Sequence, residues 1–433
     1  MARMLYSLFL YLATPWIAMR LLWRARRQPK YLRHLRERWA LWWTQPLSPR
    51  TEGGTLWLHA VSVGEMRAAQ PLVAALRAWR PRADLLITCM TPTGRAVAET
   101  LYGTTAGVRI AYLPYDYPGA TRRFLKHFRP CLGILLETEI WPNLMAATTC
   151  RHLPVVLANA RLSRRSARGY ARVAALARPA IRGLAAVAAQ GEADANRLAL
   201  LGAPRITVCG NLKFDVTPDP ELLRLGENWR ARLVPQQRPV WLAASTREGE
   251  EILLLDAFQR LRVPNALLVI VPRHPERFDA VTALAATREF SPQRRSRGMP
   301  NPEHRVWVGD SMGELAAYYR MADLAFVGGS LLPLGGQNLI EAAACGCPVL
   351  VGPHTFNFAR ASMDAIAAGA ARRVYSVEDM ATAAQRLLED PSARRRMSGA
   401  GLAFAATYRG ATERIMEVLR MATAIPDTGG SPR

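Results

Sequence analysis

The sequence predicts an α/β protein with two Rossmann-like domains that follow an apolar and basic amino-terminal segment. From Gly54 onward, short apolar runs alternate with helical stretches, which is typical of parallel sheets covered by helices. The alternation is interrupted at residues 215–220, where Pro218 and Pro220 mark a break, and it then resumes over a similar length. Before Gly54 the pattern differs, because an uncharged stretch precedes a dense basic run.

The composition is that of a folded protein with an unusual charge. Half of the 433 residues are hydrophobic, so the chain can bury a full core. The 57 Lys and Arg residues stand against 34 Asp and Glu residues, which gives a formal net charge of +23. A surplus of this size indicates a nucleic acid, an anionic membrane or a polyanionic substrate as partner.

The six cysteines indicate neither a disulfide scaffold nor a zinc domain, because none of them forms a C-x-x-C pair. Reduced thiols in a cytosolic compartment fit this pattern best. The sequence also lacks a G-x-x-x-x-G-K-[ST] phosphate loop, a clean G-x-G-x-x-G fingerprint and a metal-ligand cluster. We therefore expect a site without a metal or a cofactor.

The amino-terminal segment predicts a membrane anchor. Residues 4–19 carry no charge, although they fall short of the ~18–20 residues that span a bilayer as a helix. The basic run at residues 20–38 contains Glu37 as its only acid and suits the anionic cytoplasmic leaflet. Aromatic residues suited to a membrane interface recur: Tyr6, Tyr11, Trp16, Trp23, Trp39, Trp42 and Trp43. A single span and a helix lying in the inner leaflet both fit, and a buried helix of the first domain is the alternative.

Each half contains several predicted strands. In the first half they are residues 56–60, 85–88, 131–136, 155–158, 186–189 and 206–208, with helices expected at 66–79 and from about Gly94. In the second half they are residues 240–243, 266–271, 306–308, 324–327 and 349–351. Open parallel sheets bind ligands at the carboxyl ends of their strands, so polar residues there are the candidates for chemistry.

Carboxylates follow two strands of the first half. The strand at 56–60 runs through Ser62 into a helix, which places Glu65 at the carboxyl edge, where it can act as a general base toward a hydroxyl. The alternative is a capping role, since acids favour the first turn of a helix. Glu137 and Glu139 follow the strand at 131–136, and two such close carboxylates are costly unless they are solvated or bound. A solvated loop is the alternative there.

Turns in the second half have the character of a phosphate site. Ser245 and Thr246 lead from a strand into a helix, a geometry that holds phosphate on free backbone N–H groups. Arg273 follows the next strand between two prolines and can fork onto a phosphate, and Lys213 stands at the end of the first half. Ordinary surface positions are the alternative for both basic residues.

Paired glycines at 328–329 and 335–336 allow close backbone approach, and a helix is expected to begin at about Asn338. Glu341, in the first turn of that helix, can accept both hydroxyls of a ribose while N–H groups face a phosphate. The alternative is a glycine-rich turn before a helix that merely starts with an acid. The basic stretch at 161–168 suits phosphates or anionic lipid, or a solvated helix face.

Eight blocks occur in one order along the chain. They are HAVSVGE (59–65), TPTG (91–94), YLPYD (112–116), ETEIWPN (137–143), GNLKFD (210–215), PRHPER (272–277), GG-QN-xxE (335–341) and GPHTFNF (352–358). This series resembles the lipid A Kdo transferases, the 3-deoxy-D-manno-octulosonic acid transferases of Gram-negative bacteria. One block alone is not specific, whereas the ordered series is.

The resemblance implies a GT-B fold, in which two facing Rossmann-like domains have the site between them. It implies CMP-Kdo as donor and lipid IVA, the tetraacylated lipid A precursor, as acceptor, with no nucleic acid as partner. The location implied is the cytoplasmic side of the inner membrane, with a single N-terminal anchor. On this basis residues 1–45 are expected to be the anchor and basic segment, 46–216 the acceptor domain, 217–425 the donor domain and 426–433 a disordered tail.

The resemblance also assigns roles to residues. Glu65 matches the catalytic base, Glu137 matches an acid near the sugar, and Lys213 joins them as a catalytic residue. The matches on the CMP-Kdo side are Ser245, Thr246, Arg273, His274, Pro275, Gly336, Gln337, Asn338 and Glu341. Arg164 and Arg165 are expected to bind the acceptor. Gln337 and Leu339 depart from the family, where histidine and proline are common, and both lie beside the expected CMP site.

The expected reaction is an inverting, metal-independent transfer of Kdo to the 6′-hydroxyl of the acceptor, with Glu65 taking the proton. A nucleic-acid-binding protein is the first competing class, but the densest basic cluster adjoins an apolar segment instead of an aromatic, exposed face. A membrane-tethered nucleotide sensor without activity is the second. Another membrane-associated GT-B transferase with a UDP- or ADP-sugar donor is the enzymatic alternative.

Overall fold

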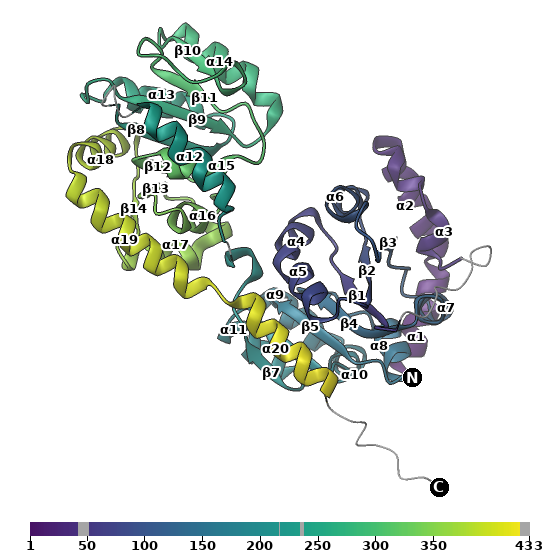
Figure 1. Cartoon of the computed structure of the whole chain (residues 1–433). Helices are drawn as coiled ribbons and strands as arrows, with labels where there is room; N and C mark the ends of the chain where they lie inside the picture. Colours follow the sequence, from purple (N-terminus) through teal and green to yellow (C-terminus); the bar gives the residue numbers. More distant parts are fainter. Residues whose placement is uncertain (42–51, 216, 234–237, 425–433) are drawn as a thin grey trace. The chain divides into compact units, whose positions relative to one another are not determined.

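The computed structural model describes residues 1–41, 52–215, 217–233 and 238–424 (Figure 1). The chain forms two compact units, each an α/β domain. The first comprises the described residues of Met1–Asp215 and Gly410–Arg433, and the second those of Val216–Arg409. Two Rossmann-like domains were predicted, and this prediction is confirmed.

The first unit contains a seven-stranded parallel sheet in the order β3-β2-β1-β4-β5-β6-β7. Its strands are β1 (Thr55–His59), β2 (Asp84–Cys89), β3 (Val108–Tyr112), β4 (Pro130–Leu136), β5 (Val155–Ala160), β6 (Ala186–Ala189) and β7 (Ile206–Val208). The strand order reverses between β1 and β4. The loops that leave these two strands therefore meet at the topological switch point of the sheet, where ligands bind in folds of this kind.

Helices cover both faces of this sheet. They are α4 (Val63–Ala68), α5 (Gln70–Trp79), α6 (Pro92–Tyr102), α7 (Pro118–Phe128), α8 (Pro142–Thr149), α9 (Arg164–Arg172), α10 (Ala174–Arg182), α11 (Glu192–Leu200) and α20 (Ala411–Ala424). Strand alternation sends Trp57 to one core and its neighbours Leu56 and Leu58 to the other. Because both faces are buried, the strands are near-continuous apolar runs in the sequence.

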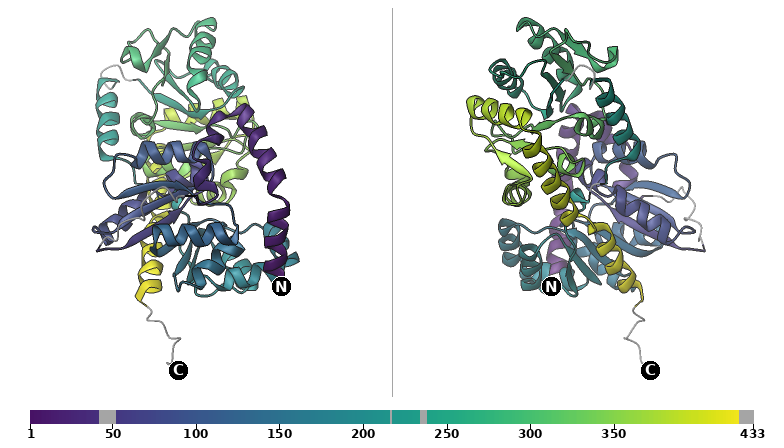
Figure 2. Two further views of the ribbon diagram at one scale, coloured as in Figure 1. Left: turned by 90° about the vertical axis from the view of Figure 1, so that its right-hand side faces the viewer. Right: turned by 60° about the vertical axis from the view of Figure 1, so that its left-hand side comes forward.

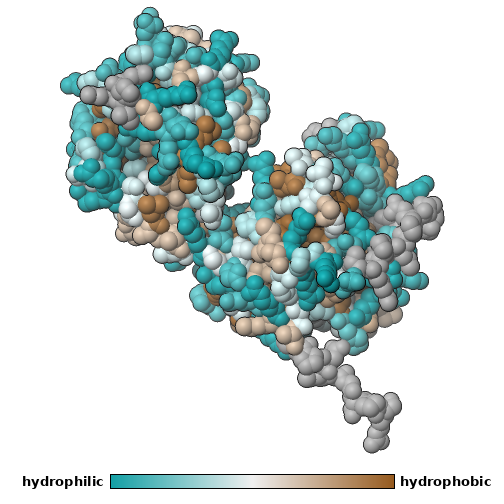
Figure 3. Space-filling view, in the orientation of Figure 1, coloured by the Kyte–Doolittle hydropathy of each residue, from teal (hydrophilic) through white to brown (hydrophobic). Residues whose placement is uncertain are grey.

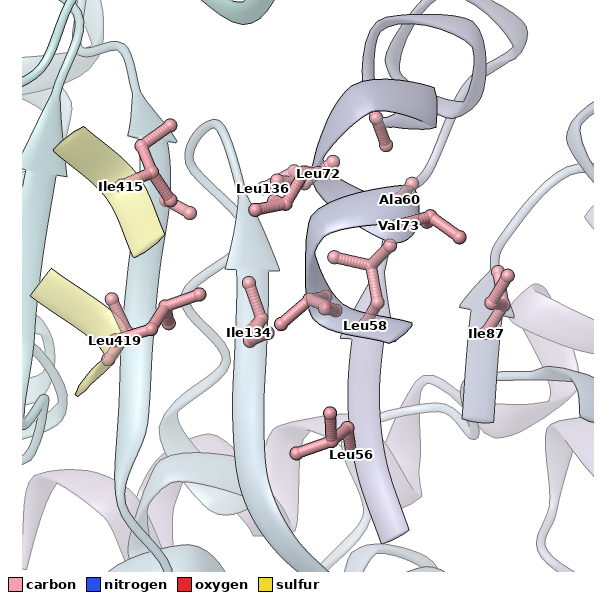
Figure 4. Packing of buried hydrophobic residues seen from close by; sticks show 14 of the residues in the cluster. Leu56, Leu58, Ala60, Leu72, Val73, Ile87, Ile134, Leu136, Ile415 and Leu419 are labelled. Carbon is pink, nitrogen blue, oxygen red and sulfur yellow. The ribbon is translucent and has the colours of Figure 1, made fainter. Parts of the chain in front are cut away.

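The carboxyl-terminal helix α20 belongs to the first unit, not to the donor domain in which it was expected up to residue 425. Its apolar face packs on α5, β5 and β6, and Ile415 and Leu419 join the core that also contains Ile134 and Leu136 of β4 (Figure 4). Asp215 accepts hydrogen bonds from the backbone N–H groups of Gly410 (2.9 Å) and Thr412 (2.7 Å), which fixes the start of the helix. The helix thus returns to the first unit because its buried face completes that core.

The second unit repeats the architecture with the strand order β10-β11-β9-β8-β12-β13-β14, again parallel. The strands are β8 (Val240–Thr246), β9 (Leu267–Pro272), β10 (Pro292–Arg294), β11 (Val306–Val308), β12 (Leu324–Val327), β13 (Val349–Val351) and β14 (Ala371–Arg373). The helices are α12 (Pro220–Leu233), α13 (Glu250–Gln259), α14 (Phe278–Thr287), α15 (Leu315–Met321), α16 (Leu339–Ala344), α17 (Ala359–Ala367), α18 (Val377–Glu389) and α19 (Pro391–Tyr408). The order reverses between β8 and β12, which defines the switch point of this sheet.

Three strands were not predicted, and all are edge strands: β3, β10 and β14. Each contains a charged residue, Arg109, Arg294 or Arg372, and each is only partly buried. They therefore lack the apolar run that marks a central strand. The predicted helix at 66–79 is two helices, α4 and α5, because a new helix begins at Gln70 with Pro71 in its first turn.

The amino-terminal segment folds into α1 (Ala2–Leu12) and α2 (Thr14–Arg27), followed by a 3₁₀ turn, η1 (Pro29–Leu32), and α3 (Leu35–Arg38) (Figures 1 and 2). Among the described residues no single helix is long and apolar enough to cross a membrane. The pair α1 and α2, bent by 52°, meets that criterion together by length and composition. Trp42, Trp43, the expected boundary at 45/46 and the expected tail at 426–433 lie outside the described residues.

Candidate active site

The switch point of the first sheet carries a buried carboxylate, Glu65. Ser62 caps α4, its hydroxyl accepting from the Glu65 N–H (3.3 Å) and donating to Oε1 of Glu65 (2.7 Å). The N–H of Val61 donates to Oε2 (2.8 Å). Glu65 therefore does cap its own helix, as the alternative held. Two accepted hydrogen bonds still leave lone pairs on a carboxylate, so the cap also orients the group for a second partner.

The environment of Glu65 makes it a stronger base than an exposed glutamate. Glu65 as a whole residue is 9% exposed, and burial raises the pKa of its carboxyl group. The hydrogen bonds from Ser62 and Val61 lower the pKa, the charge of Glu137 raises it, and Lys213 lowers it. The net direction is upward. A carboxylate of this kind has a greater affinity for a proton than one in water.

Glu137 and Lys213 form an ion pair beside Glu65, with 3.2 Å between Nζ of Lys213 and Oε1 of Glu137. Glu137 directly follows β4 and has a left-handed backbone with φ 58°, a conformation disfavoured for a residue with a Cβ atom. Lys213 lies on a 3₁₀ turn, η2 (Leu212–Phe214), whose N–H groups bind the side chains of Asn159 and Asn211 (both 3.0 Å). The structure thus brings the three expected catalytic residues of the first unit together.

A third carboxylate, Glu139, belongs to the same cluster and was not among the expected site residues. Its Oε2 accepts from Nε1 of Trp141 at 3.0 Å. Burial, followed by the charge of Glu65, raises the pKa of Glu139 from its ordinary 4.5 to about 7, and Glu137 adds to the effect. The sequence indicated this segment only through the high cost of placing two carboxylates, Glu137 and Glu139, close together. It pointed to the segment but not to the second acid as a member of the site.

The basic helix α9 is linked to this carboxylate loop. The hydroxyl of Tyr170 donates to the carbonyl of Thr138 (3.3 Å), and the Thr138 hydroxyl donates to the carbonyl of Arg161 (3.0 Å). Arg164 and Arg165 stand exposed in the first turn, which Ser163 caps. The expected acceptor-binding arginines therefore lie on the element adjoining the carboxylates, although they do not enter the cluster itself.

In the second unit, the turn after β8 is held by a buried carboxylate that was not predicted, Glu250. Its Oε2 accepts from the N–H groups of Arg247 (3.0 Å) and Gly329 (2.6 Å), and its Oε1 from Leu331 (3.0 Å). Glu250 is fully buried. It therefore joins the loops that follow β8 and β12, the two strands at the switch point.

Tight backbone packing in this region explains the paired glycines. A Cβ atom on Gly328 would lie 2.5 Å from the carbonyl oxygen of Ser245, so only glycine fits. Ser245 itself has a left-handed backbone with φ 55°. Thr246 is fully buried and its hydroxyl donates to Glu251 (3.1 Å), so this hydroxyl stabilises the turn and is not offered to a ligand.

The loop at 335–341 leads into α16 at about the expected residue, but N–H groups that were expected to face a phosphate donate within the protein. The N–H groups of Gly336 and Gln337 donate to the carbonyls of Gly329 (2.6 Å) and Gly328 (3.0 Å). Asn338 caps α16, accepting from the N–H of Ile340 (3.1 Å) and donating to Oε1 of Glu341 (3.0 Å).

Leu339, where a proline is common in the resembling family, is the buried first residue of this helix. Proline is favoured at the same position, so the departure leaves the helix start intact.

Arg273, His274 and Pro275 follow β9 and are exposed. The N–H of Arg273 donates to the carbonyl of Thr246 (3.0 Å), which holds this loop beside the turn after β8. Burial raises the pKa of Glu341, while the Asn338 amide and the positive charge of Arg273 lower it. The charge of Arg273 thus reaches Glu341, and the expected donor residues gather at one edge of the second sheet.

Neither edge shows a metal site: among the described residues no group of three or more His, Cys, Asp or Glu side chains is placed to hold a metal ion. A cavity of about 560 Å³ lies at the opposite edge of the first sheet, lined by residues such as Gly54, Pro130 and Pro154, where the strands begin. The titratable groups described above lie at the carboxyl ends instead.

Comparison with known proteins gives matches to both units. Residues 33–216 match a family described as 3-deoxy-D-manno-octulosonic-acid transferase (kdotransferase), and residues 247–403 match glycosyl transferases group 1. A 3-deoxy-D-manno-octulosonic acid transferase of Bordetella pertussis is 44% identical over 382 residues, covering 86% of this chain and 88% of the relative. One from Haemophilus influenzae is 37% identical over 426 residues, covering 97% and 98%.

Solved structures match at the level of the fold. A glycosyltransferase from Rickettsia africae has a TM-score of 0.57 and 12% identity, covering 86% of this chain and 99% of that one. UDP-GlcNAc 2-epimerase from Neisseria meningitidis has a TM-score of 0.56 and 16% identity, covering 85% and 100%. At 12% and 16% identity, both likenesses show the fold alone.

Proposed function

Because the chain belongs to the family of 3-deoxy-D-manno-octulosonic acid (Kdo) transferases, we propose that it moves Kdo from CMP-Kdo to the 6′-hydroxyl of lipid IVA. The protein is a GT-B glycosyltransferase of lipopolysaccharide core synthesis that uses CMP-Kdo. The acceptor, the position on its sugar, the inversion of configuration and the independence from metal are the proposed parts. The location proposed is the cytoplasmic side of the inner membrane.

Glu65 is proposed as the general base. It takes the proton of the acceptor hydroxyl while the hydroxyl oxygen forms a bond to the anomeric carbon of Kdo. The bond from that carbon to the phosphate of CMP breaks, and CMP leaves with the electron pair. Attack on the face opposite CMP inverts the configuration, through an oxocarbenium-like transition state. The raised pKa of Glu65 supports this role, because a base is most effective when its pKa approaches the working pH.

The three other charged groups of the cluster have supporting roles. Glu137 and Lys213, paired at 3.2 Å, are proposed to hold the sugar and to compensate charge as the leaving group departs. Glu139, whose pKa is about 7, is partly protonated near neutrality and can donate as well as accept a hydrogen bond.

The second unit is proposed to hold the nucleotide. Arg273 supplies a planar, permanently charged group for the CMP phosphate. Glu341, which accepts a hydrogen bond from the Asn338 amide, is proposed to accept the ribose hydroxyls. CMP leaves as a monophosphate, and we expect cationic side chains and backbone dipoles to balance its charge, so turnover should persist in a metal chelator.

Arg164 and Arg165 are proposed to bind the phosphate groups of the acceptor. Their helix is hydrogen-bonded to the loop that carries Glu137 and Glu139, through Tyr170 and Thr138. A phosphorylated disaccharide held by α9 would therefore lie next to the carboxylates. The positive charge of this helix suits such an acceptor.

The carrying observation is the buried, hydrogen-bonded Glu65 at the switch point of the first sheet, in one cluster with Glu137, Glu139 and Lys213. The test is incubation of the full chain with CMP-Kdo and lipid IVA, followed by mass spectrometry of the product in increments of one Kdo. Product is expected with lipid IVA and not with an analogue that lacks the 6′-hydroxyl. Transfer to that analogue, or inhibition by UDP and not by CMP, would overturn the proposal.

A further inference from the structure

The motif TPTG at residues 91–94 lies outside the carboxylate cluster, yet it adjoins the backbone that orients Glu65. The motif follows β2, the neighbour of β1 in the sheet, and forms the start of α6. Parallel strands end at one edge of a sheet, and α6 packs beside α4 there. The motif is therefore placed to act on the segment that leads from β1 to Glu65.

The hydroxyl of Thr91 is bonded in three directions. It caps α6 by accepting from the N–H of Gly94 (3.0 Å), and the Thr93 hydroxyl donates to it from 3.4 Å. A hydroxyl has two acceptor positions and one proton, so its own proton is left for the carbonyl of Val61 (3.1 Å). The visible face of the molecule is mainly hydrophilic (Figure 3), whereas this half-buried hydroxyl is turned inward onto the backbone of another element.

Gly94 allows α6 to come this close to the segment after β1. A Cβ atom on Gly94 would lie 2.9 Å from Oγ1 of Thr91 and 3.0 Å from the carbonyl oxygen of Val61, so at least one of the two atoms would have to move. Pro92 is the first residue of the helix, where its missing N–H is not needed. Each residue of the motif thus contributes to one junction between α6 and Val61.

Val61 is the residue that orients one oxygen of the base. Its N–H donates to Oε2 of Glu65 at 2.8 Å. On one side the backbone of Val61 is held by β2, because the N–H of Ala60 donates to the carbonyl of Thr88 (2.9 Å). On the other side its carbonyl is held by Thr91. The direction of the Val61 N–H, and with it the direction of the Glu65 carboxylate, depends on both attachments.

We infer that Thr91 is a positioning residue for the proposed base, and that it acts on Glu65 through the carbonyl and the N–H of Val61. This inference rests on the proposed role of Glu65 and extends it to a second strand. Thr91 does not touch the reacting atoms. A base is effective only when its lone pair is held in line with the proton that it takes, within hydrogen-bond reach. The alternative is that Thr91 serves only to cap α6.

Thr91→Val removes the hydroxyl at nearly equal size, so the carbonyl of Val61 loses its donor. We expect kcat for Kdo transfer to fall about tenfold, with KM for CMP-Kdo unchanged, because the residues proposed to bind the donor belong to the second unit. The pKa of Glu65 should rise, since the hydrogen bond from the Val61 N–H lowers it in the native chain. The acidic limb of the kcat/KM profile should therefore move to higher pH. Thr91→Ser keeps the hydroxyl and should restore all of these quantities.

Two further variants separate positioning from capping. Gly94→Ala keeps the Thr91 cap and introduces a good helix former, but its methyl group displaces the Thr91 hydroxyl or the Val61 carbonyl, so we expect the same changes as in Thr91→Val. Ser376→Ala removes the cap of α18, which accepts from the N–H of Asp379 (3.2 Å), and should change neither kcat nor the pKa of Glu65. Native behaviour of Gly94→Ala, or equal impairment in Thr91→Ser and Thr91→Val, would reduce Thr91 to a cap.

The pKa of Glu65 is measured without substrate, by NMR of the full chain with isotopically labelled glutamate carboxyl carbons. The Glu65 signal is assigned by its absence in Glu65→Gln. Among the described residues, the charged neighbours of Glu65 are Glu137, Glu139 and Lys213, and none of them is altered in the Thr91 variants. An unchanged pKa of Glu65 in Thr91→Val overturns the inference, and so does a native kcat. If the native chain transferred no Kdo, the proposed function would fail, while the titration would still decide whether Thr91 holds Glu65.

Discussion

The two sheet edges that carry the candidate site are built in opposite ways. At the switch point of the first unit the chemistry lies in side chains: Glu65, Glu137, Glu139 and Lys213 interact with one another, and burial raises the pKa of both Glu65 and Glu139. At the switch point of the second unit the main features are backbone turns and glycines. The buried acid there, Glu250, binds three N–H groups of the protein itself.

This difference agrees with the division of roles between the two domains in the proposed function. A proton must be moved on the acceptor side, which requires a group with a tuned pKa. In the proposed function the second unit has only to hold a nucleotide, and one or two cations suffice for its phosphate. Substitutions in the first edge should therefore change rate, and substitutions in the second should change donor affinity or stability.

The largest effect is expected for Glu65→Gln. The amide keeps the size of the side chain and can still accept from Val61 N–H, but it cannot take a proton. We expect kcat to fall by about 10²–10⁴-fold, with CMP binding unchanged, in steady-state transfer assays and calorimetry. Glu192→Gln is the control, because it alters an exposed first-turn glutamate of α11 and should leave kcat unchanged. Near-native kcat in Glu65→Gln would remove the base from the mechanism.

The second effect tests whether the turns after β8 and β12 in the second unit depend on the buried carboxylate of Glu250. Glu250→Ala leaves the N–H groups of Arg247, Gly329 and Leu331 without their acceptor in a buried place. An unsatisfied buried donor costs about 1–3 kcal/mol, so we expect a loss of at least about 2 kcal/mol in the free energy of unfolding and a raised KM for CMP-Kdo. Denaturant unfolding and kinetics measure the two quantities.

The exposed Glu303→Ala serves as control for this variant. Glu250→Gln should recover part of the stability, because its amide oxygen can replace one of the two acceptors. If the alanine variant kept both native stability and native KM, the turn would not depend on this carboxylate, and the contrast between the two edges would weaken.

The sequence predicted the central strands and the chemistry that is local to them. Glu65 was found because a strand, a Ser cap and an acid lie within ten residues. Glu250 was not found, because it binds a backbone N–H group in a turn that lies 79 residues further along the chain. Glu139 was missed for a related reason: its burial depends on side chains from other elements. The charged edge strands and the docking of α20 were also beyond pattern analysis, since an amphipathic helix does not indicate which of two domains its apolar face will cover.

The third effect concerns pH. Burial raises the pKa of Asp116 from 3.8 to about 6, and burial with neighbouring charges raises that of Glu139 from 4.5 to about 7. In the unfolded chain both acids ionise near their ordinary pKa, whereas in the folded chain they retain their protons longer. The contribution of these two acids to the free energy of unfolding is therefore greatest below about pH 4. This contribution is lost as the pH rises to about 7, and it levels off beyond that.

Glu139→Gln removes the part of this pH dependence of stability that extends toward pH 7. We expect the melting temperature of the variant to fall less than that of the native chain between pH 5 and pH 7, when both are followed by circular dichroism. Asp116 continues to titrate in the variant, so the decline below about pH 6 should remain. Parallel curves for the two proteins over the whole range would show that Glu139 is not held protonated by its surroundings.

The smallest effect is expected at the rim of the first edge, where α9 is exposed. Arg164→Ser with Arg165→Ser removes two charges from a surface helix, and single exposed charges contribute little because solvent and salt screen them. We therefore expect a rise of a few-fold in KM for lipid IVA, with kcat and CMP affinity unchanged, and a smaller difference from native at high salt. Arg77→Ser removes an exposed arginine from α5 and is the control. A fall in kcat, or an equal rise in KM for both substrates, would mean that α9 acts through the carboxylate loop and its Tyr170–Thr138 link. In that case the helix would serve to position the carboxylates and would not be a separate phosphate-binding surface.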